Sequence, residues 1–269
     1  MTRVLRALGA HLRAHLAIMF QYRGEVLLWS VWGIVNPAVL YVMWSSAAGS
    51  NPSQEIAGYD RAAFAAYYLM MMVVGHLTTA WDVYQMGFFV RSGVLSPQLL
   101  EPVLPMWRSV AENATYKVVT LMFTVPAWIV FALFVSPEFK TSGWEIAAGL
   151  VATVLGSILA YLLGYAISLI AFWAPKLDAL GEVYFGLGMF LGGRFAPIPA
   201  LPPIVGAVAK VLPFRWMYEF PCELLVGGRV SAADAAFGLL AQVGWLIATF
   251  VLFRVLWAAG LKQYTAVSG

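Results

Sequence analysis

Two ionisable residues in or beside one apolar segment are the first candidates for chemistry. His76 lies within the apolar segment at about 62–81, and Asp82 follows its end. Ionisable groups at membrane depth are costly and commonly mark a functional pathway, so a proton-driven secondary transporter that uses this pair is the alternative function for the sequence. The competing interpretation is a histidine that hydrogen-bonds to a neighbouring helix. No further acids accompany the pair along the segment, as a longer relay would need.

Familiar enzymatic motifs do not occur in this sequence. It contains no phosphate-binding G-x-x-x-x-G-K-[ST], no zinc-protease H-E-x-x-H and no nucleophile elbow G-x-S-x-G. His11 and His15 are four residues apart, but no further ligand lies near them and structural zinc usually takes four. We therefore expect no catalytic residue, no metal, no cofactor bound by the chain itself and no nucleic-acid partner.

A charged, proline-containing connector separates two long apolar runs. It reads RSGVLSPQLLEPVLPMWRSVAENATYK over residues 91–117, and leucine and valine recur through its first half. Prolines stiffen the backbone because each fixes one dihedral angle. The segment predicts a lever that receives force from another protein. The alternative is an amphipathic piece that lies on lipid.

Composition places the elements around these residues in a membrane. The 269 residues are 62% hydrophobic and 11% charged, with a mean hydropathy of +0.81. A soluble domain carries about 25% charged residues, so there are too few charges here to cover a water-exposed surface. The 11 Trp and 12 Tyr fit rings that anchor helices at the two membrane interfaces. The sequence therefore predicts an all-α polytopic membrane protein.

Six apolar segments are candidate membrane helices. A bilayer core of about 30 Å needs about 20 helical residues, and the fifth segment reaches this only if it extends or tilts. The segments are 26–48, 62–81, 118–135, 146–173, 178–193 and 236–258.

The charge distribution predicts the orientation. With the N-terminus inside, ten Lys and Arg fall on inner segments and six on outer ones. Inner segments of membrane proteins are enriched in these residues, so we expect both termini and the connector to be cytoplasmic. Residues 1–24 combine leucines at helical spacing with arginines. They predict an interfacial amphipathic helix, and the alternative is that they simply begin the first membrane helix.

The outer segment 194–235 is broken by prolines but remains apolar. It predicts a hairpin of two short helices that dips into or lies on the outer leaflet and forms the outer mouth of a pathway, since irregular backbone at membrane depth must be covered by protein or line a wet cavity. A proline-rich surface loop is the alternative. The candidate gate residues are Gly192, Pro197, Pro199, Pro213, Phe214 and Glu219.

Three stretches, in this order, resemble the permease subunits of ABC-2-type ATP-binding-cassette exporters, and in particular a branch of bacterial permeases of roughly this length. The first is QYRGEVLLWSVWGIVNP, the second RSGVLSPQLLEPVLP, and the third PIPALPPIVGAVAKVLPFRWMYEFPCELLVGG. The resemblance extends over essentially the whole chain.

The resemblance implies a type V exporter fold in the bacterial inner membrane. In that fold an interfacial helix precedes six membrane helices, and a re-entrant hairpin precedes the sixth. The family's coupling helix corresponds here to about residues 91–105. The residues expected to contact an ATPase are therefore Arg91, Gly93, Leu95, Leu99, Leu100, Glu101 and Pro102.

The same resemblance implies the partners and the mechanism. Two separate ATPase subunits bind ATP and magnesium, and a second permease, identical or a sister chain, completes the complex within the membrane lipids. ATP binding closes the ATPase pair and tilts the permeases, and hydrolysis resets them. Tryptophans and methionines suggest an amphiphilic or hydrophobic cargo, although lipid-facing helices would have the same composition; they are Trp29, Trp32, Trp44, Trp81 and Met70, Met71 and Met72.

Overall fold

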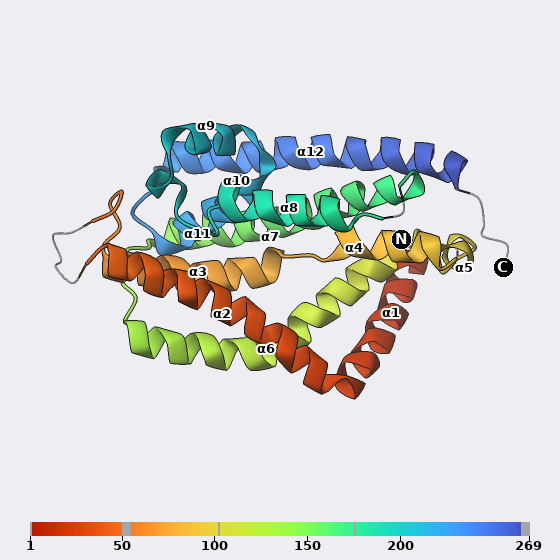
Figure 1. Cartoon of the computed structure of the whole chain (residues 1–269), viewed down its shortest axis with the longest axis horizontal. Helices are drawn as coiled ribbons and strands as arrows, with labels where there is room; N and C mark the ends of the chain where they lie inside the picture. Colours follow the sequence, from red (N-terminus) through yellow and green to blue (C-terminus); the bar gives the residue numbers. More distant parts are fainter. Residues whose placement is uncertain (1, 50–54, 102, 175, 265–269) are drawn as a thin grey trace.

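The computed structural model describes residues 2–49, 55–101, 103–174 and 176–264 (Figure 1). Within these residues the chain is all-α, with twelve α-helices and two short 3₁₀ helices. The prediction of an all-α chain is confirmed.

Five helices are long and apolar enough to cross a membrane. A rise of 1.5 Å per residue makes each of them longer than the roughly 30 Å of a bilayer core. The protein is therefore a multi-pass membrane protein with five candidate spans. They are α2 (Arg23–Ala47), α3 with α4 (Arg61–Thr78 and Asp82–Arg91), α6 (Met106–Val135), α7 with its 3₁₀ extension η1 (Gly143–Ser168 and Leu169–Phe172) and α12 (Ala232–Gln263).

The predicted fifth segment forms a shorter helix than the others. Helix α8 (Asp178–Leu191) has 14 residues, about 21 Å at 1.5 Å per residue, which falls short of the bilayer core. It ends at a glycine pair, and Gly193 has a φ of +73°. A Cβ there would also press against Tyr67 and Glu219, so the sharp turn after α8 requires glycine.

Short polar caps set where the long helices begin. The Asp60 side chain accepts a hydrogen bond of 2.7 Å from the Ala63 amide at the start of α3. Ser142 and Glu145 form a capping box at the start of α7, and Ser231 caps α12. These side chains satisfy amide groups that have no partner within a helix, so they stabilise the helix starts.

The region between α8 and α12 is a chain of short helices. These are η2 (Ile198–Ala200), α9 (Pro203–Val211), α10 (Pro213–Met217) and α11 (Glu219–Val226). Prolines stand at the first turn of η2, α9 and α10, where a missing amide proton costs no hydrogen bond. Each proline therefore starts a new piece, which is why the region contains no long helix.

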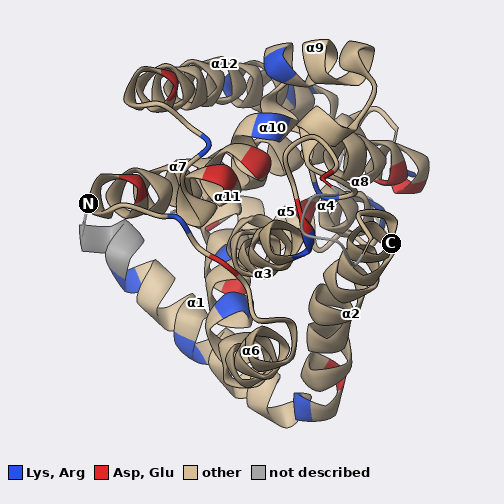
Figure 2. Ribbon diagram, turned by 90° about the vertical axis from the view of Figure 1, so that its left-hand side faces the viewer, with Lys and Arg blue, Asp and Glu red and all other residues tan. Residues whose placement is uncertain are grey.

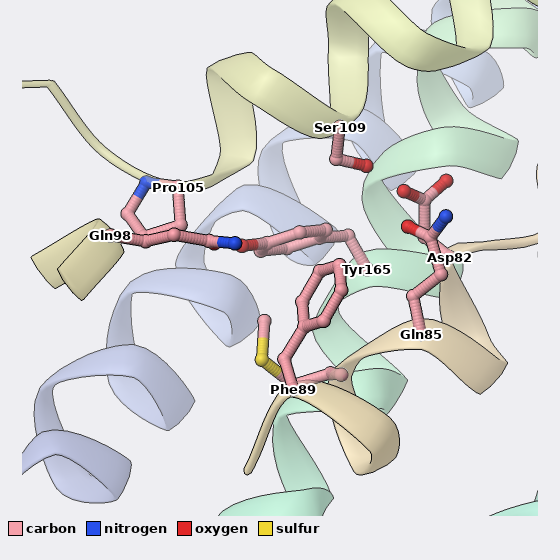
Figure 3. A pocket seen from close by; sticks show the side chains of 8 residues that line it. Asp82, Gln85, Phe89, Gln98, Pro105, Ser109 and Tyr165 are labelled. Atoms are coloured by element: carbon pink, nitrogen blue, oxygen red, sulfur yellow. The ribbon is translucent and has the colours of Figure 1, made fainter. Parts of the chain in front are cut away.

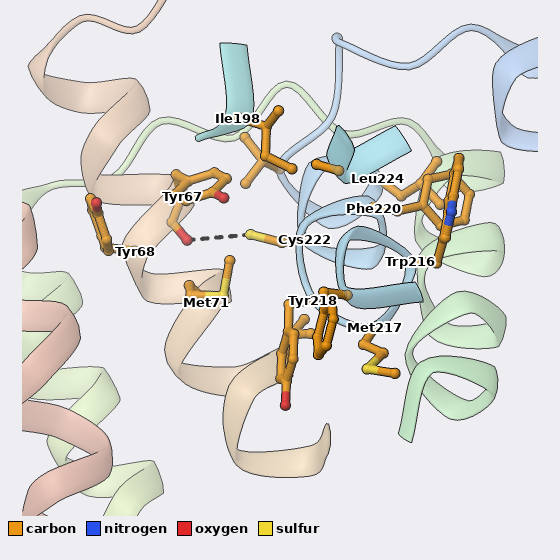
Figure 4. Packing of buried hydrophobic residues seen from close by; sticks show 14 of the residues in the cluster. Tyr67, Tyr68, Met71, Ile198, Trp216, Met217, Tyr218, Phe220, Cys222 and Leu224 are labelled. Carbon is orange, nitrogen blue, oxygen red and sulfur yellow. Dashed lines mark hydrogen bonds between the residues drawn. The ribbon is translucent and has the colours of Figure 1, made fainter. Parts of the chain in front are cut away.

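The main core lies between α3, α7 and this set of short helices. Helix α3 occupies the centre of the bundle in Figure 2 and contacts α2, α6, α7 and α11. Its Tyr67 and Tyr68 are fully buried, and the Cys222 thiol on α11 donates to the Tyr67 carbonyl (Figure 4). Helices α10 and α11 are therefore part of the core, whereas α9 lies at the surface with only Ala209 buried.

Helix α1 (Thr2–Gln21) lies outside this core and packs mainly against α6. It joins α2 at Tyr22, and together with α2 and α6 it forms an arm on one side of α3 (Figures 1 and 2). His15 is buried in the contact with α6, and this burial lowers the pKa of its imidazole. His11 places its Nε2 3.7 Å from Glu101, so α1 also contacts the connector.

Candidate functional sites: the inner connector, the outer hairpin and an aromatic cavity

The connector after α4 contains one short helix, α5 (Leu95–Leu99). Gly93 turns the chain with a φ of +72°, a left-handed conformation that favours glycine. Leu95 is fully buried against the bundle and Leu99 is partly buried. Leu100, in contrast, is 88% exposed, and Glu101 is exposed beside it.

Several contacts hold this connector in place. The Ser96 hydroxyl lies 2.7 Å from the Tyr264 hydroxyl after α12, and Tyr161 of α7 donates to the Met106 carbonyl. Arg91 is exposed at the end of α4. Pro102 lies outside the described residues. The connector therefore presents an exposed tip at Leu100 and Glu101 on an anchored base.

Asp82 lies at the base of this connector. It is buried at the start of α4, and its Oδ2 accepts a 2.7 Å hydrogen bond from Asn113. With Gln98, Ser109 and Tyr165 it lines a cavity of about 10 Å³, where residues from α4, α5, α6 and α7 meet (Figure 3). One polar atom of each residue has no hydrogen-bond partner in the described part of the chain. The space and its donors and acceptors match a single bridging water.

His76 has other partners and is not joined to Asp82. Its Nε2 lies 3.1 Å from the Lys117 carbonyl and 3.4 Å from the Thr120 hydroxyl, and its ring meets the edge of Trp128. No hydrogen bond between described residues links His76 with Asp82. His76 and Asp82 instead contact different residues of α6. The contacts of His76 are those of a histidine that packs against a neighbouring helix.

The predicted outer gate residues are distributed along the short helices. Gly192 is buried at the end of α8, where a Cβ would overlap the Tyr218 ring. Pro197 is buried and Pro199 is exposed beside it. Pro213 and Phe214 are buried at the start of α10.

Glu219 is the centre of a buried charged cluster. It is fully buried, and it accepts hydrogen bonds from the Ile198 amide and, at 2.9 Å, from Arg215 Nε. Arg215 also reaches Glu223 at 3.6 Å, and Glu223 accepts from the Tyr59 hydroxyl. The cluster therefore connects η2, α10 and α11 to the segment before α3.

Sequence reasoning found only part of this cluster. It named Glu219 as a candidate gate residue, but it did not include Glu223 or Tyr59. The four-residue spacing between Glu219 and Glu223 was the available signal, since residues four apart share a helix face. Tyr59 is distant in sequence and carried no signal.

A comparison with known protein families matches residues 26–268 to the family described as ABC-2 family transporter protein. The chain belongs to the ABC-2 transporter family. No curated protein gives a match to this chain. Since the match extends over nearly all of the sequence, the five candidate spans are those of an ABC-2 transporter membrane component. Such components are typically non-catalytic, and the family works with an ATPase partner.

The ABC-2 protein also contains a cavity of about 290 Å³ between α2, α3 and the first half of α6. Several predicted cargo-contacting side chains line it together, and Arg194 and His76 join them. We call it the aromatic cavity; its aromatic and methionine lining residues are Trp29, Trp32, Met71, Met72, Trp81 and Tyr116. Trp44 is directed elsewhere, because its indole nitrogen donates to the Phe195 carbonyl.

Proposed function

We propose that this chain is the permease subunit of an ATP-binding-cassette exporter. It would move an amphiphilic or hydrophobic substrate across the bacterial inner membrane. Two separate ATPase subunits would bind ATP and magnesium, and a second permease, identical or a sister chain, would complete the pathway. The membership of the ABC-2 family supports this proposal, and the chain would itself contribute motion and a route rather than catalysis.

The observation that carries the proposal is the contrast between α5 and Leu100, the residue that follows it. Leu95 and Gln98 are buried in the bundle, whereas Leu100 is 88% exposed at the connector's tip. A leucine that projects from an anchored helix suits a hydrophobic groove on a partner. Force on this tip would reach α4, α6 and α7 through the residues that pack around α5.

The proposed topology has six membrane passes with both termini in the cytoplasm. Helix α8 would be the short fifth pass, and the helices α9–α11 would form the re-entrant hairpin on the outer side. Contacts along α7 support this, because Met217 lies against Gly156 near the middle of α7 and Leu224 against Gly149, nearer its start. The chain would thus go inward to α10 and return with α11. Helix α1 would lie at the inner interface.

The decisive experiment is co-purification of an ATPase with the tagged permease from its native cell in mild detergent. We expect Leu100→Asp to reduce the amount of bound ATPase at least about tenfold, which corresponds to about 1.4 kcal/mol. The reason is that a carboxylate placed in an apolar groove loses its hydration without gaining a partner.

Leu261→Asp is the matched control, because Leu261 is also exposed near the end of α12 but lies outside the connector. It should retain the ATPase. If Leu100→Asp inserts into the membrane and retains the ATPase at normal stoichiometry, the exposed tip after α5 is not the docking element. A proton-coupled flux by the permease alone would instead support a secondary transporter that uses His76 and Asp82.

A further inference from the structure

Arg194 is a cation without an anionic partner in the described structure. It follows the glycine pair after α8 and is half-buried. Its guanidinium has five N–H donors and no acceptor. Among the described residues no carboxylate forms an ion pair with it. Its guanidinium carbon lies over the face of the Tyr218 ring, 5.1 Å from the ring centroid.

The residues on either side of Arg194 hold it within the bundle. The Gly193 carbonyl accepts a 2.7 Å hydrogen bond from Tyr67, and the Phe195 carbonyl accepts from Trp44 and Tyr68. These donors lie on α2 and α3, which are both candidate spans. Arg194 is therefore fixed between membrane helices, where an uncompensated charge is expensive and commonly marks a ligand pathway.

The aromatic cavity, which Arg194 lines, has an apolar part and a polar part. Three tryptophans and two methionines supply apolar, adaptable walls. Asn36, Thr79 and His76 add polar groups, and none of the described lining residues is an acid. A ligand that matches this surface has an apolar body and one anionic head.

We propose that the aromatic cavity is a cargo site for an anionic amphiphile whose phosphate, sulfate or carboxylate head pairs with Arg194. A planar guanidinium binds such heads through two parallel hydrogen bonds, and a low-dielectric setting strengthens the interaction. The apolar chain lies along Trp29, Trp32 and Met72. This inference rests on the proposed export function and specifies the substrate class.

The test uses the full-length permease in zwitterionic phosphatidylcholine nanodiscs. Calorimetric titration compares three twelve-carbon probes: dodecyl phosphate, dodecyl maltoside and dodecyltrimethylammonium. We expect dodecyl phosphate to bind most tightly and Arg194→Gln to weaken its binding at least about tenfold. Arg194→Lys should retain part of the affinity, because it keeps the charge and loses the two-pronged geometry.

Two control variants separate the site from general charge and general hydrophobicity. Arg254→Gln removes an exposed cation on α12, and Trp144→Ala removes an exposed tryptophan on α7, outside the cavity. Both should bind dodecyl phosphate normally, whereas Trp32→Ala should bind it more weakly. Equal affinity for all three probes, or equal losses in Arg194→Gln and Arg254→Gln, overturns the proposal.

A second measurement distinguishes cargo from a structural lipid. In the complex with its ATPase, dodecyl phosphate should stimulate ATP hydrolysis by the wild type and not by Arg194→Gln. Binding without stimulation would make the cavity a lipid site and reject the cargo assignment. The binding titration needs no ATPase, so its failure is distinguishable from a failure of the export proposal, which the Leu100 variants test.

Discussion

At the residue scale, the outer cluster shows how a buried charge is accommodated. Burial raises the pKa of Glu219 to about 8, the nearby Glu223 carboxylate pushes it in the same direction, and Arg215 opposes both. Glu219 shares Arg215 with Glu223, so the arginine does not offset burial and the second acid at Glu219, whereas Arg229 acts on Glu223. The folded protein therefore binds protons at Glu219 more tightly than the unfolded chain does.

This imbalance predicts a pH-dependent stability. A raised folded-state pKa gives a contribution that is present at low pH and is lost as pH rises towards about 8. We expect the thermal midpoint of the wild type in nanodiscs to fall between pH 5 and 8, and Glu219→Gln to flatten this part of the profile. Glu55→Gln, at an exposed position, should retain the wild-type slope. An unchanged profile for Glu219→Gln would show that the carboxylate is ionised throughout.

At the element scale, the contact between α7 and the short outer helices depends on small residues. A Cβ at Gly156 would lie 2.8 Å from the Met217 carbonyl oxygen and one at Gly149 would lie 2.7 Å from Leu225. Small residues permit such close contact between helices in membranes. At Gly156 the neighbour is backbone, so it cannot move aside by changing a rotamer.

We expect Gly156→Ala to displace α10 and to destabilise the protein by about 1–3 kcal/mol, the usual cost of overpacking. Export should fall more than ATPase retention, because α10 lies far along the chain from the connector. The measurements are the thermal midpoint, ATPase co-purification and transport. Gly244→Ala on α12 is the control, since a Cβ there meets no atom within 4 Å. Equal export by both variants would make the outer hairpin a passive loop.

At the scale of the whole molecule, the arrangement of the ends carries the functional argument. The connector, the N-terminal part of α1 and the end of α12 lie at one end of the bundle, and the starts of α3, α7 and α12 lie at the other (Figure 1). An exporter driven from the inside needs the first end in the cytoplasm. The outer hairpin must then face the opposite side.

Cysteine labelling tests this orientation directly. The native Cys222 is fully buried, so it should not react and the chain needs no cysteine removal. We expect Ser92→Cys to react with a membrane-impermeant maleimide only after the inner membrane is opened. Ala233→Cys, at the start of α12, should react without opening it. Labelling of Ser92→Cys from the outside would invert the topology and remove the ATPase from the proposed mechanism.

The sequence by itself determined that this protein lies in a membrane, and it located most of the long helices. With 11% charged residues no aqueous surface can be formed, and runs of about 20 apolar residues locate the spans regardless of what they pack against. The closely spaced prolines likewise indicated the short outer pieces, because each lacks an amide proton, whereas the isolated Pro37 and Pro126 lie inside long helices. The motif pattern sufficed to suggest the ABC-2 family, which the family match confirms.

Only the tertiary structure decided which side chains meet. The leucines of the connector look equivalent in sequence, yet Leu95 is buried because α5 packs against the bundle, and Leu100 is exposed just after α5 ends. Arg194, Trp32 and Met72 are remote in the chain, and only the crossing of α2 and α3 beside the end of α8 brings them to one cavity. Local patterns report what each segment prefers, whereas a binding surface depends on distant contacts that no local pattern contains.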